Sequence, residues 1–131
     1  MSIQQVKDFH EKFGLPTGEK DCLTASQAVA EFRLAFMQEE LDEFEEASLN
    51  SDRVKMFDAL LDLAYVVYGT ALFMGIPPAQ WEEGMAAVQK ANMSKVRATD
   101  GSSKRGTSLD VIKPEGWVGP EEELARILGE E

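Results

Sequence analysis

Apolar residues recur at every third or fourth position along most of the chain, which is the spacing of an amphipathic helix. The pattern predicts four main helices and a short acidic fifth helix, over residues 3–13, 24–49, 52–74, 78–96 and 120–131. Residues 98–119 are rich in Gly and Ser and are predicted to form a loop, and no segment has a strand pattern long enough for a sheet. The predicted fold class is all-α, a bundle of four to five helices.

Local signals place the ends of these helices. Thr24 and Gln27 resemble a capping box at the start of the second helix. Either Ser51 or Asp52 is suited to cap the third helix, and Pro78 is suited to the first position of the fourth. The chain is therefore divided into helices that are joined by short loops.

The length of 131 residues suits one domain with a single sizeable core. We predict one domain over residues 1–131, with a helical core over 24–97 and a basic loop and short C-terminal helix over 98–131. The segment from Met56 to Met74 is apolar nearly all round, which is typical of a central helix. Because such a helix needs more than three neighbouring helices to cover it, we expect oligomerisation to complete the bundle.

The chain is strongly acidic, with 24 Asp and Glu against 13 Lys and Arg and a net charge of −11 at pH 7. Such a surface repels phosphate backbones, which argues against a nucleic-acid partner. The most apolar run, residues 63–76, is shorter than the roughly 20 residues of a membrane helix, so we expect no membrane association. Neither an export signal nor a second cysteine beside Cys22 is visible, and we expect a cytoplasmic protein.

The acidic residues of the second predicted helix form two groups. Segment 31–46 holds seven acidic residues and one arginine. On a helical wheel, Glu40 and Glu43 lie on the apolar stripe that includes Phe32 and Phe36, and Glu39 flanks this stripe. The outward face carries the remaining polar residues, among them Glu31, Gln38, Asp42 and Glu45. A solvated acidic face is the usual interpretation of such a run, but it does not explain acidic residues on an apolar stripe.

The third predicted helix carries Asp58 and Asp62 four positions apart, so they share one face. They could cap or bond to neighbouring backbone, although aspartate is unfavourable inside a helix. An isolated carboxylate in a dry core costs tens of kcal/mol in the Born limit, against about 5–15 kcal/mol of total stability. The five carboxylates must therefore be protonated, paired with Arg or Lys, or bound to cations; they are Glu39, Glu40, Glu43, Asp58 and Asp62.

Divalent cations are the solution that the residue types favour. The basic residues of these two helices, Arg33, Arg53 and Lys55, are expected to be too few and too peripheral to pair with five carboxylates. Mg²⁺ prefers oxygen ligands and is commonly held by carboxylates together with substrate phosphates. Zinc is excluded by its ligands, because the chain offers only Cys22 and His10, and His10 is expected to be a surface or stripe-edge residue.

Basic residues gather toward the C-terminal half. Six of the 13 lie between residues 90 and 113, where only two acidic residues occur. Asn92 lies on the apolar stripe of the fourth helix with Lys95 beside it, which fits either a buried hydrogen-bonding group or a ligand contact. The segment is either a solvated basic loop or a phosphate-binding flank, and triphosphate chemistry needs both cations and such donors.

Four segments, in this order, resemble the all-α nucleoside triphosphate pyrophosphohydrolases, the MazG-like and phosphoribosyl-ATP pyrophosphohydrolase-like superfamily. Residues 39–43 (EELDE) are similar to its Glu-Glu-x-x-Glu motif. The next helix carries Glu-x-x-Asp in the family, whereas residues 59–62 here read ALLD, with Asp58 one position earlier than the missing glutamate. Residues 90–95 (KANMSK) resemble a phosphate-contacting segment, and residues 113–117 (KPEGW) resemble the tail that follows.

The resemblance, over about residues 24–120, implies hydrolysis of a (deoxy)nucleoside triphosphate to the monophosphate and pyrophosphate, as housekeeping of the nucleotide pool. It implies Mg²⁺, with Mn²⁺ as a substitute, held by Glu40, Glu43 and Asp62, with Asp58 in place of the missing glutamate. Glu39 would orient or deprotonate the attacking water. The implied phosphate-binding residues are Asn92, Lys95, Lys104, Arg105 and Lys113. The resemblance also implies a homodimer or homotetramer in which two chains form each site.

A different class of function fits the charge pattern as well. A non-enzymatic acidic helical adaptor would bind a basic partner through the second helix and the acidic tail. A metal-storage or structural bundle is a third alternative. Mg²⁺-dependent release of pyrophosphate separates the enzyme from both.

Overall fold

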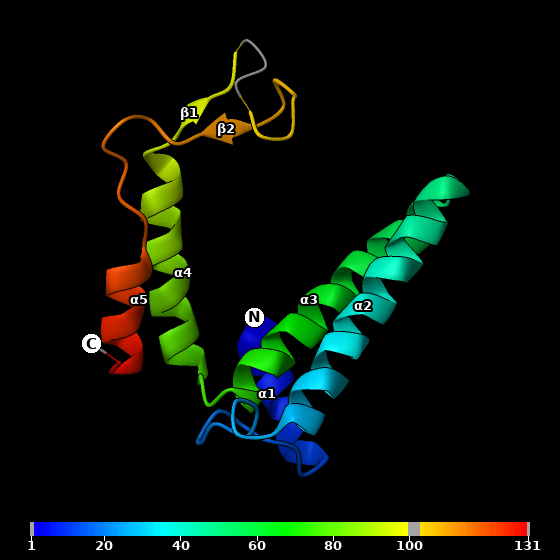
Figure 1. Ribbon diagram of the computed structural model, residues 1–131. Coiled ribbons are helices and arrows are strands. Elements are labelled where there is room, and N and C mark those ends of the chain that lie inside the picture. Colours follow the sequence, from blue (N-terminus) through cyan, green and yellow to red (C-terminus); the bar gives the residue numbers. More distant parts are fainter. Residues whose placement is uncertain (1, 100–102, 131) are drawn as a thin grey trace. The chain divides into compact units, whose positions relative to one another are not determined.

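The computed structural model describes residues 2–99 and 103–130 and is almost entirely helical (Figure 1). In this part of the chain it has five helices and one pair of two-residue strands. The helices are α1 (Ser2–Lys12), α2 (Gln27–Leu49), α3 (Arg53–Phe73), α4 (Pro78–Met93) and α5 (Glu121–Leu128). The prediction of an all-α fold is confirmed.

Local signals account for most helix ends. The Asp52 side chain accepts a hydrogen bond from the backbone N–H of Lys55 at 3.1 Å and caps α3, and Pro78 is the first residue of α4, both as predicted. The start of α2 differs, because Ser26 rather than Thr24 is its N-cap. The Thr24 hydroxyl instead donates to Asp21, whose carboxylate organises the preceding turn.

The end of α4 also differs from the prediction. The helix ends at Met93 rather than near Val96, because β1 (Val96–Arg97) pairs antiparallel with β2 (Val111–Ile112). The expectation of no sheet was wrong at this point, since a two-residue ladder is too short to show an alternating pattern in the sequence. The predicted loop 98–119 includes residues 100–102, which lie outside the described residues.

The residues up to Trp81 form one compact unit. In this unit α2 and α3 pack side by side, and α1 packs against α3 (Figure 1). Its core consists of Ile3, Val6, Ala71 and Leu72, with the half-buried residues Tyr68, Ile76 and Trp81 packed against it. Full burial of an aliphatic side chain stabilises a fold by about 1.5–3 kcal/mol, so α1 contributes substantially to this core.

Large apolar side chains remain exposed on α2 and α3. They include Phe32, Leu34, Leu41, Leu49, Val54, Phe57, Leu60 and Leu61. A soluble protein rarely leaves a large contiguous apolar patch uncovered, so such a face is typical of a surface that binds a partner. Completion of the bundle by oligomerisation stays a prediction.

The helix α3 has 21 residues, and its most apolar stretch has a mean hydropathy of 1.4. By length and composition alone it could cross a membrane. No membrane span was expected from the sequence, because its most apolar run, residues 63–76, is short. The helix α3 is longer than this run. A single helix of this kind is weak evidence for a membrane span, because the core helix of a helical bundle has the same composition.

Residues 82–130 belong to a second compact unit, which holds most of α4, the strand pair and α5. Ala87 and Ala91 of α4 are buried in it, and the indole Nε1 of Trp117 donates to the carbonyl of Ala91 at 2.8 Å. The boundary between the two units lies inside the predicted core of residues 24–97. A single domain over the whole chain stays a prediction.

Candidate functional site

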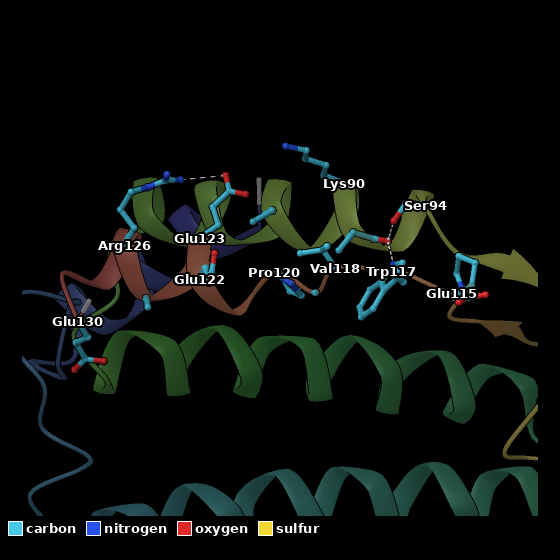
Figure 2. A pocket seen from close by; sticks show the side chains of 16 residues that line it. Lys90, Ser94, Glu115, Trp117, Val118, Pro120, Glu122, Glu123, Arg126 and Glu130 are labelled. Atoms are coloured by element: carbon cyan, nitrogen blue, oxygen red, sulfur yellow. Dashed lines mark hydrogen bonds and ion pairs between the residues drawn. The ribbon is translucent and has the colours of Figure 1, made fainter.

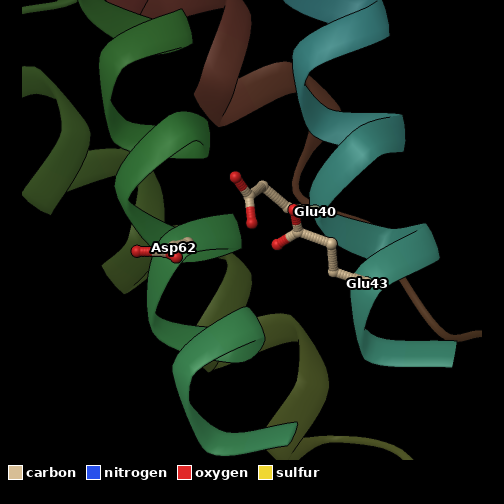
Figure 3. A group of neighbouring side chains, drawn as sticks. All are labelled: Glu40, Glu43 and Asp62. Atoms are coloured by element: carbon tan, nitrogen blue, oxygen red, sulfur yellow. The ribbon is translucent and has the colours of Figure 1, made fainter. Parts of the chain in front are cut away.

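Three of the predicted metal ligands lie together where α2 packs against α3. One carboxylate oxygen from each of Glu40, Glu43 and Asp62 lies within 4.8 Å of the others. Glu40 and Glu43 are separated by one helical turn, and both extend from α2 toward α3 (Figure 3). The structure thus brings these three carboxylates close enough to share a cation, and we call them the carboxylate cluster.

Glu40 is the buried member of the carboxylate cluster. Its side chain is 8% exposed, and its Oε2 has no hydrogen-bond partner within the described part of the chain. Burial, and then the carboxylates of Glu43, Asp62 and Glu39, raise the pKa of Glu40 to about 7. A buried acceptor without a partner costs about 1–3 kcal/mol. A divalent cation at this position would provide the missing partner, so the cluster fits a hard metal ion.

The other two predicted acidic residues lie at the edge of the carboxylate cluster. Asp58 is exposed and lines a cavity of about 320 Å³ together with Glu43 and Lys55. Desolvation, followed by the charges of Asp58 and Glu43, raises the pKa of Asp62. Glu39 is exposed on α2, and its charge contributes to the raised pKa of Glu40. Both residues therefore act on the cluster electrostatically without converging on its centre.

The predicted phosphate-binding residues fall into separate places within the second unit. The Nζ atoms of Lys95 and Lys113 lie 5.1 and 5.0 Å from the ring centroid of Trp117. Asn92, which could have been a buried hydrogen-bonding group, is exposed, and so is Lys104. The structure brings Lys95 and Lys113 to one aromatic ring, and neither Asn92 nor Lys104 shares a described contact with them.

Arg105 is engaged within its own loop. Its Nε forms an ion pair with Asp110 Oδ2 at 2.9 Å, and Asp110 also accepts a hydrogen bond from the Ser103 hydroxyl. The hydrogen bonds from Arg105, Ser103 and the Val111 backbone hold the pKa of Asp110 well below its usual range. Arg105 therefore stabilises the loop between the two strands.

The model of the phosphoribosyl-ATP pyrophosphohydrolase family matches residues 6–92. The chain belongs to this family. The family is part of the MazG-like all-α nucleoside triphosphate pyrophosphohydrolase superfamily, so the resemblance noted in the sequence is confirmed. The match includes the carboxylate cluster and Asn92 but ends before Lys95, and no curated protein matches the chain. Members of the family are divalent-metal-dependent pyrophosphohydrolases.

The first unit also buries an arginine that was expected to be peripheral. Arg33 is 5% exposed, and its guanidinium lies 4.6 Å from the ring centroid of Phe73. Its Nη2 donates to the Val66 carbonyl at 3.0 Å, and its Nε donates to the Thr70 hydroxyl at 3.1 Å. The expectation that Arg33 is peripheral was wrong, because its partners on α3 are 33 and 37 residues away in sequence.

His10 is buried as well, at 3% exposed, rather than at the surface or a stripe edge. Its Nδ1 lies 2.6 Å from the Pro16 carbonyl, and burial lowers its pKa. A Cβ atom at Gly69 would lie 2.7 Å from Arg33 Nη2 and 2.9 Å from His10 Nε2. Both side chains therefore pack directly on the α3 backbone, one to two turns from Asp62, and only glycine fits there.

A cavity of about 1130 Å³ lies between α4, residues 114–120 and α5 (Figure 2). Trp117 lines it on one side, and Glu122, Glu123 and Arg126 of α5 line it on another. From the sequence, Trp117 was expected to pack in the core or to stack on a nucleobase, and no contact with a lysine was predicted. The KPEGW segment was the one available signal, because it joins a basic residue to an aromatic one.

Proposed function

We propose that this chain hydrolyses the bond between the α- and β-phosphates of a (deoxy)nucleoside triphosphate, releasing the monophosphate and pyrophosphate. The observation that carries the proposal is the carboxylate cluster, in a chain that belongs to a family of pyrophosphohydrolases. Phosphoribosyl-ATP, which the family's name specifies, is the second candidate substrate, because it is itself an adenine nucleotide with a 5′-triphosphate. We expect the enzyme to act in the cytoplasm on the nucleotide pool.

The residues of the carboxylate cluster would hold Mg²⁺, or Mn²⁺ in its place. We assign Glu40, Glu43 and Asp62 as direct ligands and Asp58 as a weaker ligand, either direct or through a water molecule. When bound, the cation supplies positive charge to the phosphate oxygens and acidifies bound water. The unpaired, buried oxygen of Glu40 supports this assignment, because a cation would satisfy it.

Glu39 is our candidate for the residue that orients the attacking water. Its exposed side chain is next to Glu40 in sequence and close enough to influence the ionisation of Glu40. A carboxylate in such a place can accept a hydrogen bond from water and take its proton as the water attacks the α-phosphate.

Basic and amide side chains of the second unit would bind the phosphates. We assign this role to Asn92, Lys95, Lys104, Arg105 and Lys113. Arg105 would have to exchange Asp110 for a phosphate, so we expect a smaller contribution from it than from Lys95 and Lys113.

The alternative of a non-enzymatic acidic adaptor is less well supported. An adaptor needs exposed charge. The Glu40 carboxyl group, whose pKa is raised to about 7, is instead buried and out of reach of a protein partner. The same holds for a structural bundle, which gains nothing from three close carboxylates.

The test is release of pyrophosphate from a panel of canonical and damaged deoxynucleoside triphosphates, ribonucleoside triphosphates and phosphoribosyl-ATP. Phosphorus NMR distinguishes pyrophosphate from orthophosphate, with Mg²⁺, Mn²⁺ or a chelator in parallel reactions. We expect pyrophosphate only with metal, and loss of about a hundredfold or more of the rate in Glu43→Gln and Asp62→Asn variants that keep their helical circular dichroism. Wild-type turnover in both variants, or no pyrophosphate from any substrate, would refute the proposal.

A further inference from the structure

Two lysines from distant parts of the second unit meet at one indole ring. Lys95 follows the end of α4 and Lys113 follows β2, and their Nζ atoms lie 5.1 and 5.0 Å from the centroid of the Trp117 ring. These are distances at which the face of an indole attracts a cation. Trp117 thus contacts two positive charges that are 18 positions apart in sequence.

The Trp117 ring is itself held in place. Its Nε1 donates to the carbonyl of Ala91, a buried residue in the last turn of α4, and this carbonyl also accepts from the Ser94 hydroxyl at 2.6 Å (Figure 2). The backbone N–H of Trp117 donates to the Pro114 carbonyl at 3.0 Å and closes a turn. The indole therefore has a fixed position at the end of α4.

The strand pair brings the two lysines to this ring. Val96 pairs with Ile112, and these residues directly follow Lys95 and precede Lys113. The short ladder, which the sequence did not predict, therefore holds the backbones of the two lysines side by side.

The two ammonium groups are available to a ligand. Within the described residues neither Lys95 nor Lys113 forms an ion pair with a carboxylate, in contrast to Arg105 and Arg126. Two like charges on one ring repel each other, and a multivalent anion that contacts both would remove this repulsion. Because both Nζ atoms lie close to one ring centroid, a chain of two or three phosphates can reach both of them, whereas a monophosphate contacts one ammonium group well.

We propose that Trp117 is a positioning residue that holds Lys95 and Lys113 as one binding site for a polyphosphate chain. For the nucleotide, this rests on the proposed function, in which the same lysines bind substrate phosphates. The new elements are the indole as the organiser of the pair and a di- or triphosphate chain as the ligand that spans it.

The experiment measures binding of inorganic triphosphate by calorimetry in the presence of a chelator, so that the carboxylate cluster cannot contribute through a metal. We expect Lys95→Ala and Lys113→Ala each to weaken binding about tenfold, in line with the loss of one charge-assisted hydrogen bond. Trp117→Leu should weaken binding by a similar factor, because both lysines lose their fixed position. In a protein that already carries Trp117→Leu, Lys95→Ala should weaken triphosphate binding by only about a further twofold, because the two lysines are no longer held in position. Inorganic phosphate should bind much more weakly to all of these proteins.

Two controls separate positioning from stability and from general charge. Lys12→Ala removes a lysine that lies 5.5 Å from the Phe13 ring in α1, so it deletes the same kind of contact outside the pair and should leave binding unchanged. Trp117→Phe keeps an aromatic face but loses the N–H bond to Ala91, and should be intermediate. In steady-state assays Trp117→Leu should raise KM for the nucleotide while kcat changes little.

Wild-type binding of triphosphate by Trp117→Leu or Trp117→Phe alongside impaired lysine variants would overturn the role of the indole. Absence of triphosphate binding by the wild-type chain would overturn the site. If the wild-type chain binds triphosphate through the pair but releases pyrophosphate from no nucleotide, the proposed function fails and the polyphosphate site stands.

Discussion

Glu40 binds its proton more tightly than an ordinary glutamate, because its carboxyl is buried beside three other carboxylates. The folded chain therefore keeps this proton at a pH where the unfolded chain has lost it. A metal ion competes with the proton for the same oxygens. At the residue scale, pH and metal thus act on one side chain.

We predict that the metal-free protein loses stability as pH rises from about 4.5 to about 7, the interval between the unfolded and folded pKa values of Glu40. The raised pKa of Asp62 acts in the same direction. Urea unfolding at pH 5.5 and 8 with a chelator present measures this, and Glu40→Gln should flatten the dependence. If the free energy of unfolding changes equally between pH 5.5 and 8 in the wild type and in Glu40→Gln, the prediction is contradicted. Millimolar Mg²⁺ should raise Tm more at pH 8 than at pH 5.5.

Asp58→Asn should separate metal affinity from turnover. Asp58 lies at the edge of the carboxylate cluster and acts on Asp62 through its charge. We therefore expect the variant to need about three to ten times more Mg²⁺ for half-maximal activity, while the rate at saturating metal changes little. Ala59→Glu, which restores the family's glutamate, should partly rescue it. An unchanged Mg²⁺ dependence would make Asp58 a structural residue.

At the scale of the elements, Arg33 connects α2 to α3 next to the carboxylate cluster. Arg33 precedes Glu40 by two helical turns, and its acceptor Val66 follows Asp62 by one turn. The packing of Arg33 and of His10 on α3 depends on the absence of a side chain at Gly69. The packing at Gly69 thus contributes to the alignment of the two helices that carry the cluster.

Gly69→Ala should destabilise the protein by about 1–3 kcal/mol, since its Cβ would displace two buried side chains. It should also weaken Mg²⁺-dependent stabilisation, because α2 would shift relative to α3. Gly84→Ala is the matched control, because its Cβ would meet Leu124 at 3.5 Å, an ordinary contact. This substitution should raise the free energy of unfolding by up to about 1 kcal/mol, because alanine has the higher helix propensity. Chemical unfolding measures both, and similar effects of the two substitutions would contradict the argument.

The elements themselves were predictable where their signals are local. The Asp52 cap, Pro78 and the apolar spacing indicated the helices. The helical wheel placed Glu40 and Glu43 on a buried stripe, and the structure buries Glu40 but leaves Glu43 exposed. The errors at Arg33 and at the strand pair arise from tertiary contacts, because long-range partners leave no periodic signal in the sequence. Asn92 lay on an apolar stripe yet is exposed, since the wheel shows a face but not what covers it.

At the scale of the whole molecule, the exposed apolar side chains of α2 and α3 predict self-association. Phe57 is 64% exposed, Leu61 54% and Leu60 49%. We expect light scattering at micromolar concentration to give the mass of two or four chains. Phe57→Glu should shift the protein toward the monomer and lower its activity, as expected if two chains form each site. A wild-type monomer would contradict the prediction.

The two tryptophans of the chain give each compact unit a fluorophore of its own. Trp81 packs on Tyr68 at the core of the first unit, and Trp117 is anchored to Ala91 in the second. In Trp117→Phe and Trp81→Phe variants, the remaining emission therefore monitors one unit at a time. If the predicted single domain is cooperative, both variants will show midpoints that coincide with the loss of helical circular dichroism. Two separate midpoints would mean that the boundary within α4 is a thermodynamic one.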